Sequence, residues 1–146
     1  MSGFRFSLQQ VLDYREQLKE QAQVAYARVQ TELLREETQA ESLRRLLSDQ
    51  EGKLFSTLPG DQGERWLLEN YGRGIRADLN ETLLRVRSLT SLVEEARQEL
   101  TRRARDHKIL EKLKTRQAER HTRDARVQEQ RTYDETAAIR FKAPTV

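Results

Sequence analysis

Two histidines are the side chains best suited to bind a metal ion or transfer a proton, but their spacing separates them. His107 and His121 stand 14 residues apart. On one helix that is about 21 Å along the axis, too far for both to bind one metal ion. His107 also follows Leu100 by seven residues, which predicts that it faces a partner helix. The chain has no cysteine, which excludes disulfides and thiolate chemistry. We expect no metal site and no cofactor.

Two glycine-containing segments, 60–63 and 72–74, could be mistaken for phosphate-binding loops. They read Gly-Asp-Gln-Gly and Gly-Arg-Gly, and neither has the Gly-Lys-Ser/Thr ending of a P-loop or a strand before it. The carboxylates alternate with Arg and Lys, as on a solvated coiled-coil face. Catalysis needs a pocket with converging groups, and this pattern offers none. The chain is therefore predicted not to be an enzyme.

The last third of the chain is basic. Residues 1–96 carry 13 Lys/Arg against 16 Asp/Glu, a balance of −3, and residues 97–146 carry 14 against 8, a balance of +6. The densest basic stretch consists of Arg102, Arg103, Arg105, Lys108, Lys112, Lys114 and Arg116. Acidic residues interrupt this stretch, and no aromatic residue between Tyr71 and Tyr133 could stack on a base. The pattern favours a solvated or protein-binding face and no nucleic acid, with a basic coiled-coil nucleic-acid-binding protein as the alternative.

The composition predicts long helices without a thick core. The 146 residues are 35% charged and 36% hydrophobic, with only 6 Gly and 2 Pro, whereas compact domains are roughly 45–50% apolar. No apolar run reaches the roughly 18 residues of a membrane span, and the start has no secretory apolar region. We expect one domain, residues 1–146, that is soluble and intracellular.

Most of the helix-breaking residues lie near the middle of the chain, where Leu58-Pro59-Gly60-Asp61 is the strongest turn signal. Asp61 and Glu64 have the spacing of a capping box. The sequence therefore predicts helix 1 over about 6–58, a turn at about 59–61 and helix 2 over about 62–140.

Seven-residue repeats run through both predicted helices. Helix 1 carries Leu33, Ala40, Leu47 and Leu54, and an earlier series of Val11, Leu18 and Ala25 in a register shifted by one position near Val29. Helix 2 carries Leu79, Val86, Val93 and Leu100. Such repeats are typical of coiled coils, and a shifted register predicts a local change in winding.

The expected fold is all-α: two long helices in an antiparallel coiled-coil hairpin, with a C-terminal single-helix overhang from about Thr115. Paired residue numbers should add to about 120. Gly72 and Gly74 each disfavour a helix by about 1 kcal/mol relative to Ala, so this segment is expected to be soft, and replacing both by Ala is expected to raise stability.

The N-terminal segment reads Phe4-Arg5-Phe6-Ser7-Leu8-Gln9-Gln10-Val11-Leu12-Asp13-Tyr14-Arg15. This order resembles the opening of the FliJ family, small coiled-coil proteins of the bacterial flagellar export apparatus. Two later stretches, Lys108 to Lys114 and Tyr133 to Phe141, are similar to the family's Leu-Glu-Lys-Leu and Asp-Glu-x-Ala…Arg-Phe segments.

The resemblance implies a non-enzymatic stalk of the flagellar type III export apparatus, with roles in flagellum biogenesis and chemotaxis. Its implied partners are the hexameric export ATPase, whose ring assembly it promotes, the export gate protein FlhA and the export chaperones. Its implied place is the cytoplasm, at the cytoplasmic face of the inner membrane at the flagellar base. A stalk of a virulence type III secretion system and a generic scaffold coiled coil are further alternatives. The candidate partner-binding residues are Phe4, Phe6, Leu8, Leu12, Tyr14, Arg15, Arg116, Arg120, Arg123, Arg126, Tyr133, Asp134 and Glu135.

Overall fold

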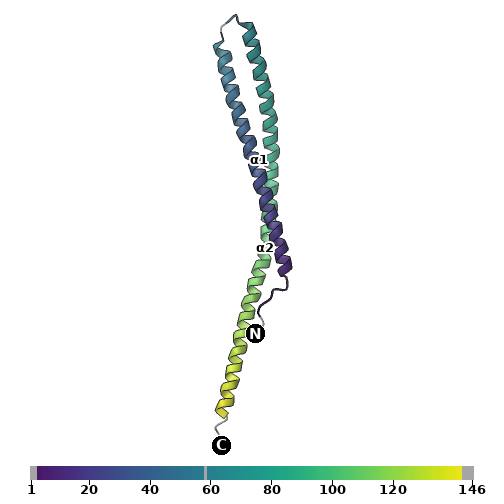
Figure 1. Cartoon of the computed structure of the whole chain (residues 1–146), viewed down its shortest axis with the longest axis vertical. Coiled ribbons are helices and arrows are strands. Elements are labelled where there is room, and N and C mark those ends of the chain that lie inside the picture. The colour runs from purple at the N-terminus through teal and green to yellow at the C-terminus, as the bar shows by residue number, and fades with distance from the viewer. Residues whose placement is uncertain (1–2, 58, 143–146) are drawn as a thin grey trace. The chain divides into compact units, whose positions relative to one another are not determined.

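The computed structural model describes residues 3–57 and 59–142, which form two helices, α1 (Gln9–Ser56) and α2 (Gln62–Lys142) (Figure 1). The all-α helical hairpin is confirmed, and the described residues contain no strand. The expected end of helix 1 at residue 58 lies outside the described residues, and α2 continues two residues beyond the expected 140. Neither of the two helices, as far as they are described, is apolar enough over a long enough stretch to cross a membrane.

The chain divides into two compact units, each built from a part of both helices. We call residues 20–101 the turn unit and residues 1–19 with 102–146 the terminal unit. The turn unit contains the end of α1, the connection and the start of α2. The terminal unit contains the start of α1 and the rest of α2.

The connection between the helices contains the glycine that the turn requires. Gly60 has a φ of 121°, a backbone conformation that is unfavourable for residues with a Cβ atom. Asp61 then caps α2, because its Oδ1 accepts a hydrogen bond from the backbone N–H of Glu64 at 3.2 Å. The same closeness brings two carboxyl groups together, so that hydrogen bonding and repulsion from Asp61 raise the pKa of Glu64.

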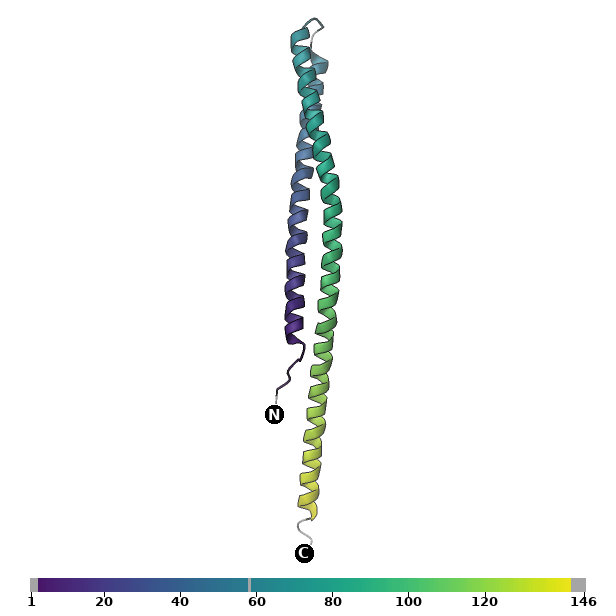
Figure 2. The ribbon, with the colours of Figure 1, turned by 90° about the vertical axis from the view of Figure 1, so that its right-hand side faces the viewer.

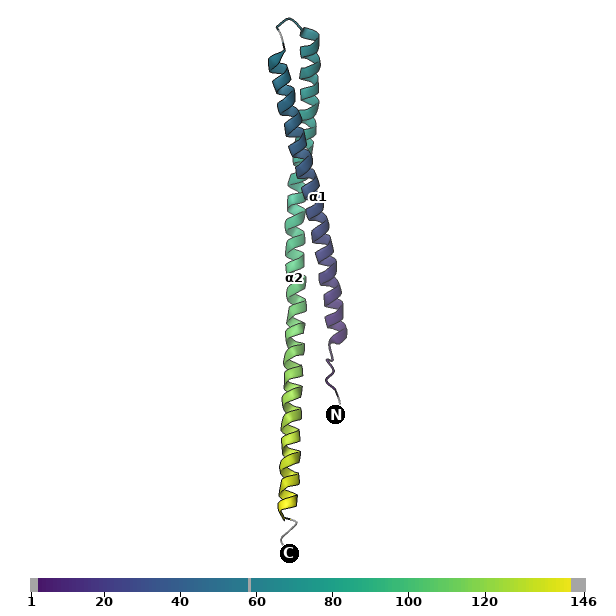
Figure 3. The same cartoon turned by 60° about the vertical axis from the view of Figure 1, so that its left-hand side comes forward.

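In the turn unit the two helices run antiparallel and stay side by side in both views (Figures 2 and 3). On α1 the residues turned toward α2 follow one unbroken three-four spacing. They are Ala22, Tyr26, Val29, Leu33, Glu36, Ala40, Leu43, Leu47, Gln50 and Leu54, all buried or half-buried. On α2 the corresponding residues are Leu68, Gly72, Ile75, Leu79, Thr82, Val86, Leu89, Val93, Ala96 and Leu100. This spacing is that of a two-stranded coiled coil.

The predicted change of register near Val29 is wrong. Ala25, which belonged to the separate early series, is exposed, and Tyr26 is half-buried in its place. The series seemed broken only because polar and aromatic residues such as Glu36 and Tyr26 were not counted among the facing positions. A facing position in a coiled coil accepts such residues when their polar ends reach partners or water.

Helix α2 continues through Gly72 and Gly74, and the expected softness of this segment stays a prediction. Gly72 is buried, and Gln50 of α1 fills the space beside it. The buried Gln50 amide donates a 2.6 Å hydrogen bond to the backbone oxygen of Leu68. Gly74 is exposed, and a Cβ added there would meet nothing within 4 Å. The two glycines therefore differ: only Gly72 makes room for a side chain of the other helix.

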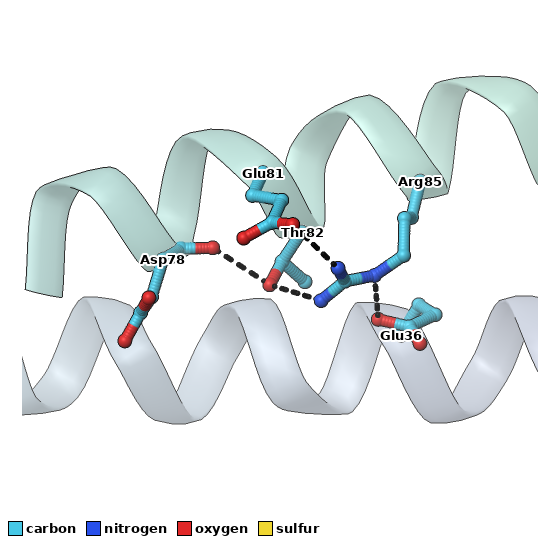
Figure 4. A network of polar contacts seen from close by, with 5 residues as sticks. All are labelled: Glu36, Asp78, Glu81, Thr82 and Arg85. Carbon is cyan, nitrogen blue, oxygen red and sulfur yellow. Dashed lines mark hydrogen bonds and ion pairs between the residues drawn. The ribbon is translucent and has the colours of Figure 1, made fainter.

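A polar network joins the helices near the middle of the turn unit (Figure 4). The Arg85 guanidinium of α2 donates from Nε to Glu36 of α1 at 3.3 Å and from Nη2 to the Thr82 hydroxyl at 3.2 Å. Thr82, only 1% exposed, donates in turn to the backbone oxygen of Asp78 at 2.8 Å. The numbers of the Glu36–Arg85 pair add to 121, which agrees with the predicted register. A second ion pair, Glu51–Arg76 at 3.3 Å, also joins the helices, but its numbers add to 127.

Candidate partner-binding surface

The terminal unit begins with residues 3–8, which we call the strap; residues 3–6 are extended and residues 7 and 8 form a turn (Figure 3). It precedes α1 (purple, Figure 3), and its link to the helix is a turn in which the Gln9 N–H donates to the Phe6 oxygen at 3.1 Å. Exposure alternates along the strap, since Phe4 and Phe6 are turned inward while Arg5 and Ser7 are exposed. In an extended chain residues two apart share a face, whereas on a helix they would point apart. This is why α1 begins at Gln9 and not at the expected residue 6.

The strap packs on α2 through its two phenylalanines. Phe6 forms a buried cluster with Leu12 and Leu110, against which Phe4 also packs. The Phe4 ring lies 5.8 Å from the ring of His121, centroid to centroid, at 52°. An extended residue advances about 3.3 Å but a helical one only about 1.5 Å, so the strap reaches further along α2 than a helix of equal length would.

The start of the single-helix overhang therefore moves. The sequence placed it at about Thr115, but Phe4 of the strap lies against His121, and Ala118 is half-buried. From Arg126 to Phe141 every described residue is exposed. The overhang predicted by pairing residues whose numbers add to about 120 is thus shortened by about three turns, because the strap is extended.

Polar contacts complete the packing of the terminal unit. Arg15 Nη1 donates to the backbone oxygen of Asp106 at 2.9 Å. His107 is buried, as predicted for a residue facing the other helix, and its Nδ1 lies 3.5 Å from Glu111 Oε2. Within the described residues no group of three or more metal-binding side chains comes together.

The structure places the predicted N-terminal binding residues in three groups. Phe6 and Leu12 are buried within the chain, at 7% and 6% exposure. Tyr14 and Leu8 are exposed, at 60% and 38%. Phe4 and Arg15 are half-buried. Only the second and third groups offer side-chain atoms to another molecule, while the first group fixes the strap.

The predicted basic residues lie on α2 next to the strap. Arg116, Arg120, Arg123 and Arg126 are all exposed. A groove of about 590 Å³ runs along this part of α2, lined by Phe4, Lys114, Thr115, Ala118, Glu119, Thr122, Arg123 and Arg126. Sequence reasoning missed the groove, because it needs Phe4 to lie beside a helix face more than a hundred residues away in the chain.

The remaining predicted residues lie on the exposed end of α2. Tyr133 is 72% exposed, and Asp134 and Glu135 are exposed beside it. Asp134 accepts a hydrogen bond from Gln130 Nε2 at 3.1 Å. Ile139 and Phe141 are 70% and 86% exposed, so this end of the helix carries apolar surface with no covering residues in the described part of the chain.

The family model described as FliJ, Flagellar FliJ protein, matches residues 4–145, nearly the whole chain. No curated protein and no solved structure matches it.

Proposed function

Because the chain belongs to the family of flagellar FliJ proteins, which are components of the flagellar export apparatus, we propose that it is a non-enzymatic stalk that binds the export ATPase ring. In this proposal it promotes assembly and activity of the hexamer, contacts the export gate protein FlhA and handles export chaperones. It acts in the cytoplasm, held at the membrane face through the apparatus. The family match over residues 4–145 is the observation that carries the proposal.

The terminal unit supplies the surface that we assign to the ATPase. Exposed apolar side chains, Tyr14 and Leu8, lie at the start of α1, and four exposed arginines lie on α2. Charged groups at the rim of an interface mainly set the association rate and its salt dependence. The arginines would accordingly draw the stalk to an acidic surface, while the apolar groups would contribute affinity.

The exposed end of α2 supplies a second contact. A single polar helix is marginally stable in water unless it packs against a partner. Tyr133 and Phe141 are exposed there, and aromatic side chains are enriched at protein interfaces. We assign this segment to the ring as well, with Asp134 and Glu135 as its polar contacts.

The test is to purify the cognate export ATPase and measure its oligomerisation and turnover with and without the chain. Replacing Arg116, Arg120, Arg123 and Arg126 by Glu should abolish most of the stimulation. A chain ending at Val127, which keeps the strap contacts, should stimulate less than the whole chain.

The turn unit offers a matched control. Replacing its exposed Arg28, Arg35, Arg73 and Arg87 by Glu changes the net charge equally and should leave most of the stimulation intact. An equal loss in both variants would show that net charge alone matters. If the unmodified chain neither binds the ATPase nor changes its turnover, the proposed function is wrong.

A further inference from the structure

The groove beside the strap has a floor of small side chains on one face of α2. Thr115, Ala118 and Thr122 line it, and their three-four spacing keeps them on the same face over two turns. The Thr115 and Thr122 hydroxyls donate to backbone oxygens of their own helix, each at 3.0 Å. The floor thus offers methyl groups and no free hydroxyl hydrogen, which suits an apolar ridge.

One wall of the groove is aromatic. Phe4 lines it from the strap, and it is held there by its packing on the buried cluster and on His121. An aromatic ring that is only half-buried offers its remaining surface to an apolar side chain of another molecule.

The other lining residues are mostly cationic. Lys114, Arg123 and Arg126 line the groove with a single carboxylate, Glu119. No ion pair engages these three cations within the part of the chain that the structure describes. A bound segment that carries carboxylates beside its apolar ridge would form ion pairs with these three cations.

We propose that this groove binds an acidic amphipathic helix of the export ATPase, laid along residues 114–126 with its apolar ridge against Ala118 and Phe4. Helices that dock in grooves present apolar anchors three and four residues apart, and the small residues of the floor have the matching spacing. This inference rests on the proposed function and adds the chemistry of the contact, namely which face of α2 is bound and what kind of segment binds it.

The absence of cysteine makes a site-specific test possible. Thr122→Cys places a thiol in the groove, and Asp124→Cys places one two residues on, about 200° around the helix, at an exposed position outside the groove. Each variant carries a benzophenone maleimide, is mixed with purified export ATPase and irradiated, and the cross-linked peptides are identified by mass spectrometry. We expect the label at 122 to cross-link to an acidic helical segment at least about fivefold more than the label at 124.

Charge reversal provides a second measurement. Lys114, Arg123 and Arg126 changed together to Glu should weaken binding to the ATPase about tenfold or more, since each attraction becomes a repulsion. The matched control changes Arg105, Lys108 and Lys112 to Glu, which are exposed and outside the groove, and should weaken binding less than about threefold. Circular dichroism of both variants establishes that helix content is kept.

The outcomes separate the two proposals. Equal cross-linking from both labels, cross-links to a segment that is neither helical nor acidic, or equal weakening by both charge reversals would overturn the groove assignment while stimulation by the unmodified chain still supports the stalk function. Absence of any binding to the ATPase would overturn both.

Discussion

Gln50 of α1 occupies the space that Gly72 of α2 leaves open: a Cβ at residue 72 would lie 2.7 Å from Gln50 Oε1. The buried Gln50 amide also donates to the Leu68 backbone oxygen. A glycine that disfavours its own helix thereby allows a buried polar side chain of the other helix to find a partner. The pair is one of the contacts that join the two helices near the turn.

Gly72 and Gly74 should respond differently to replacement by Ala. Gly74→Ala should raise the free energy of unfolding by about 1 kcal/mol, because its Cβ would meet nothing. Gly72→Ala should gain nothing or lose stability, since the new Cβ displaces the Gln50 amide and breaks its hydrogen bond. Thermal unfolding monitored by circular dichroism measures both.

A double-mutant cycle identifies the cause. In a Gln50→Ala background the space beside residue 72 is empty, so Gly72→Ala should there recover the stabilisation of about 1 kcal/mol expected for an open helical site. If Gly72→Ala has the same effect in both backgrounds, the contact with Gln50 does not determine the cost.

The packing of the strap on α2 should depend on Phe6. Phe6→Ala removes a buried ring from the cluster with Leu12 and Leu110 and should cost about 3 kcal/mol, the lower end for a buried Phe. The loss should be local to the terminal unit, seen as faster hydrogen exchange at residues 102–121. Tyr14→Ala, at a 60% exposed position, is the control and should leave exchange nearly unchanged. Equal acceleration by both would show that the cluster does not hold the strap.

Two exposed glutamates should have pKa values that depart from the ordinary glutamate pKa in opposite directions. The pKa of Glu64 is raised by Asp61, so its contribution to stability is present at low pH and lost as pH rises through the raised pKa. The pKa of Glu94 is lowered by hydrogen bonding to Arg97, so its contribution is present at higher pH and lost as pH falls through the lowered pKa. Carboxyl carbon shifts followed by NMR measure both.

The Asp61→Asn substitution separates two effects of Asp61, the capping of α2 and the effect of its carboxylate on the pKa of Glu64. Asn caps a helix about as well as Asp, so α2 should keep its start while the pKa of Glu64 falls toward its ordinary value. A Glu64 pKa that stays raised in this variant would mean that Asp61 is not the cause.

The sequence predicted the hairpin well because heptad spacing and a Pro-Gly turn are local signals. Leu79, Val86 and Val93 lie where their spacing placed them. The sequence did not predict which polar residues face the other helix. Glu36 and Gln50 have the character of surface residues, and only the structure shows that α2 places Arg85 beside Glu36 and leaves space for Gln50 at Gly72. Such pairings depend on two distant segments, which no local pattern contains.

The candidate surface was predicted less completely, for a related reason. The Phe-x-Phe spacing at residues 4–6 has the two-residue period of an extended segment, but the neighbouring heptads favoured extending the helix over it. With the strap extended, Phe4 lies beside His121 and the groove is formed. The basic residues were found from sequence, whereas their arrangement around Phe4 was not.

The exposed end of α2 should gain order when the chain binds the ATPase. All described residues from Arg126 to Phe141 are exposed, and a lone polar helix of this length is marginal in water. In the free chain we expect amides of residues 127–141 to exchange rapidly, while those of the turn unit near Ala40 and Ile75, which are buried, are protected. With the ATPase added, amide exchange over residues 127–141 should slow at least about tenfold. Helix propensity alone does not keep this segment folded, whereas packing against a partner would stabilise it.

A chain with Tyr133, Ile139 and Phe141 changed to Ser should lose most of that protection but keep the protection of the turn unit. Protection of 127–141 that is already high in the free chain, or that is unchanged by the ATPase, would show that this end of α2 is not the segment that the ring orders.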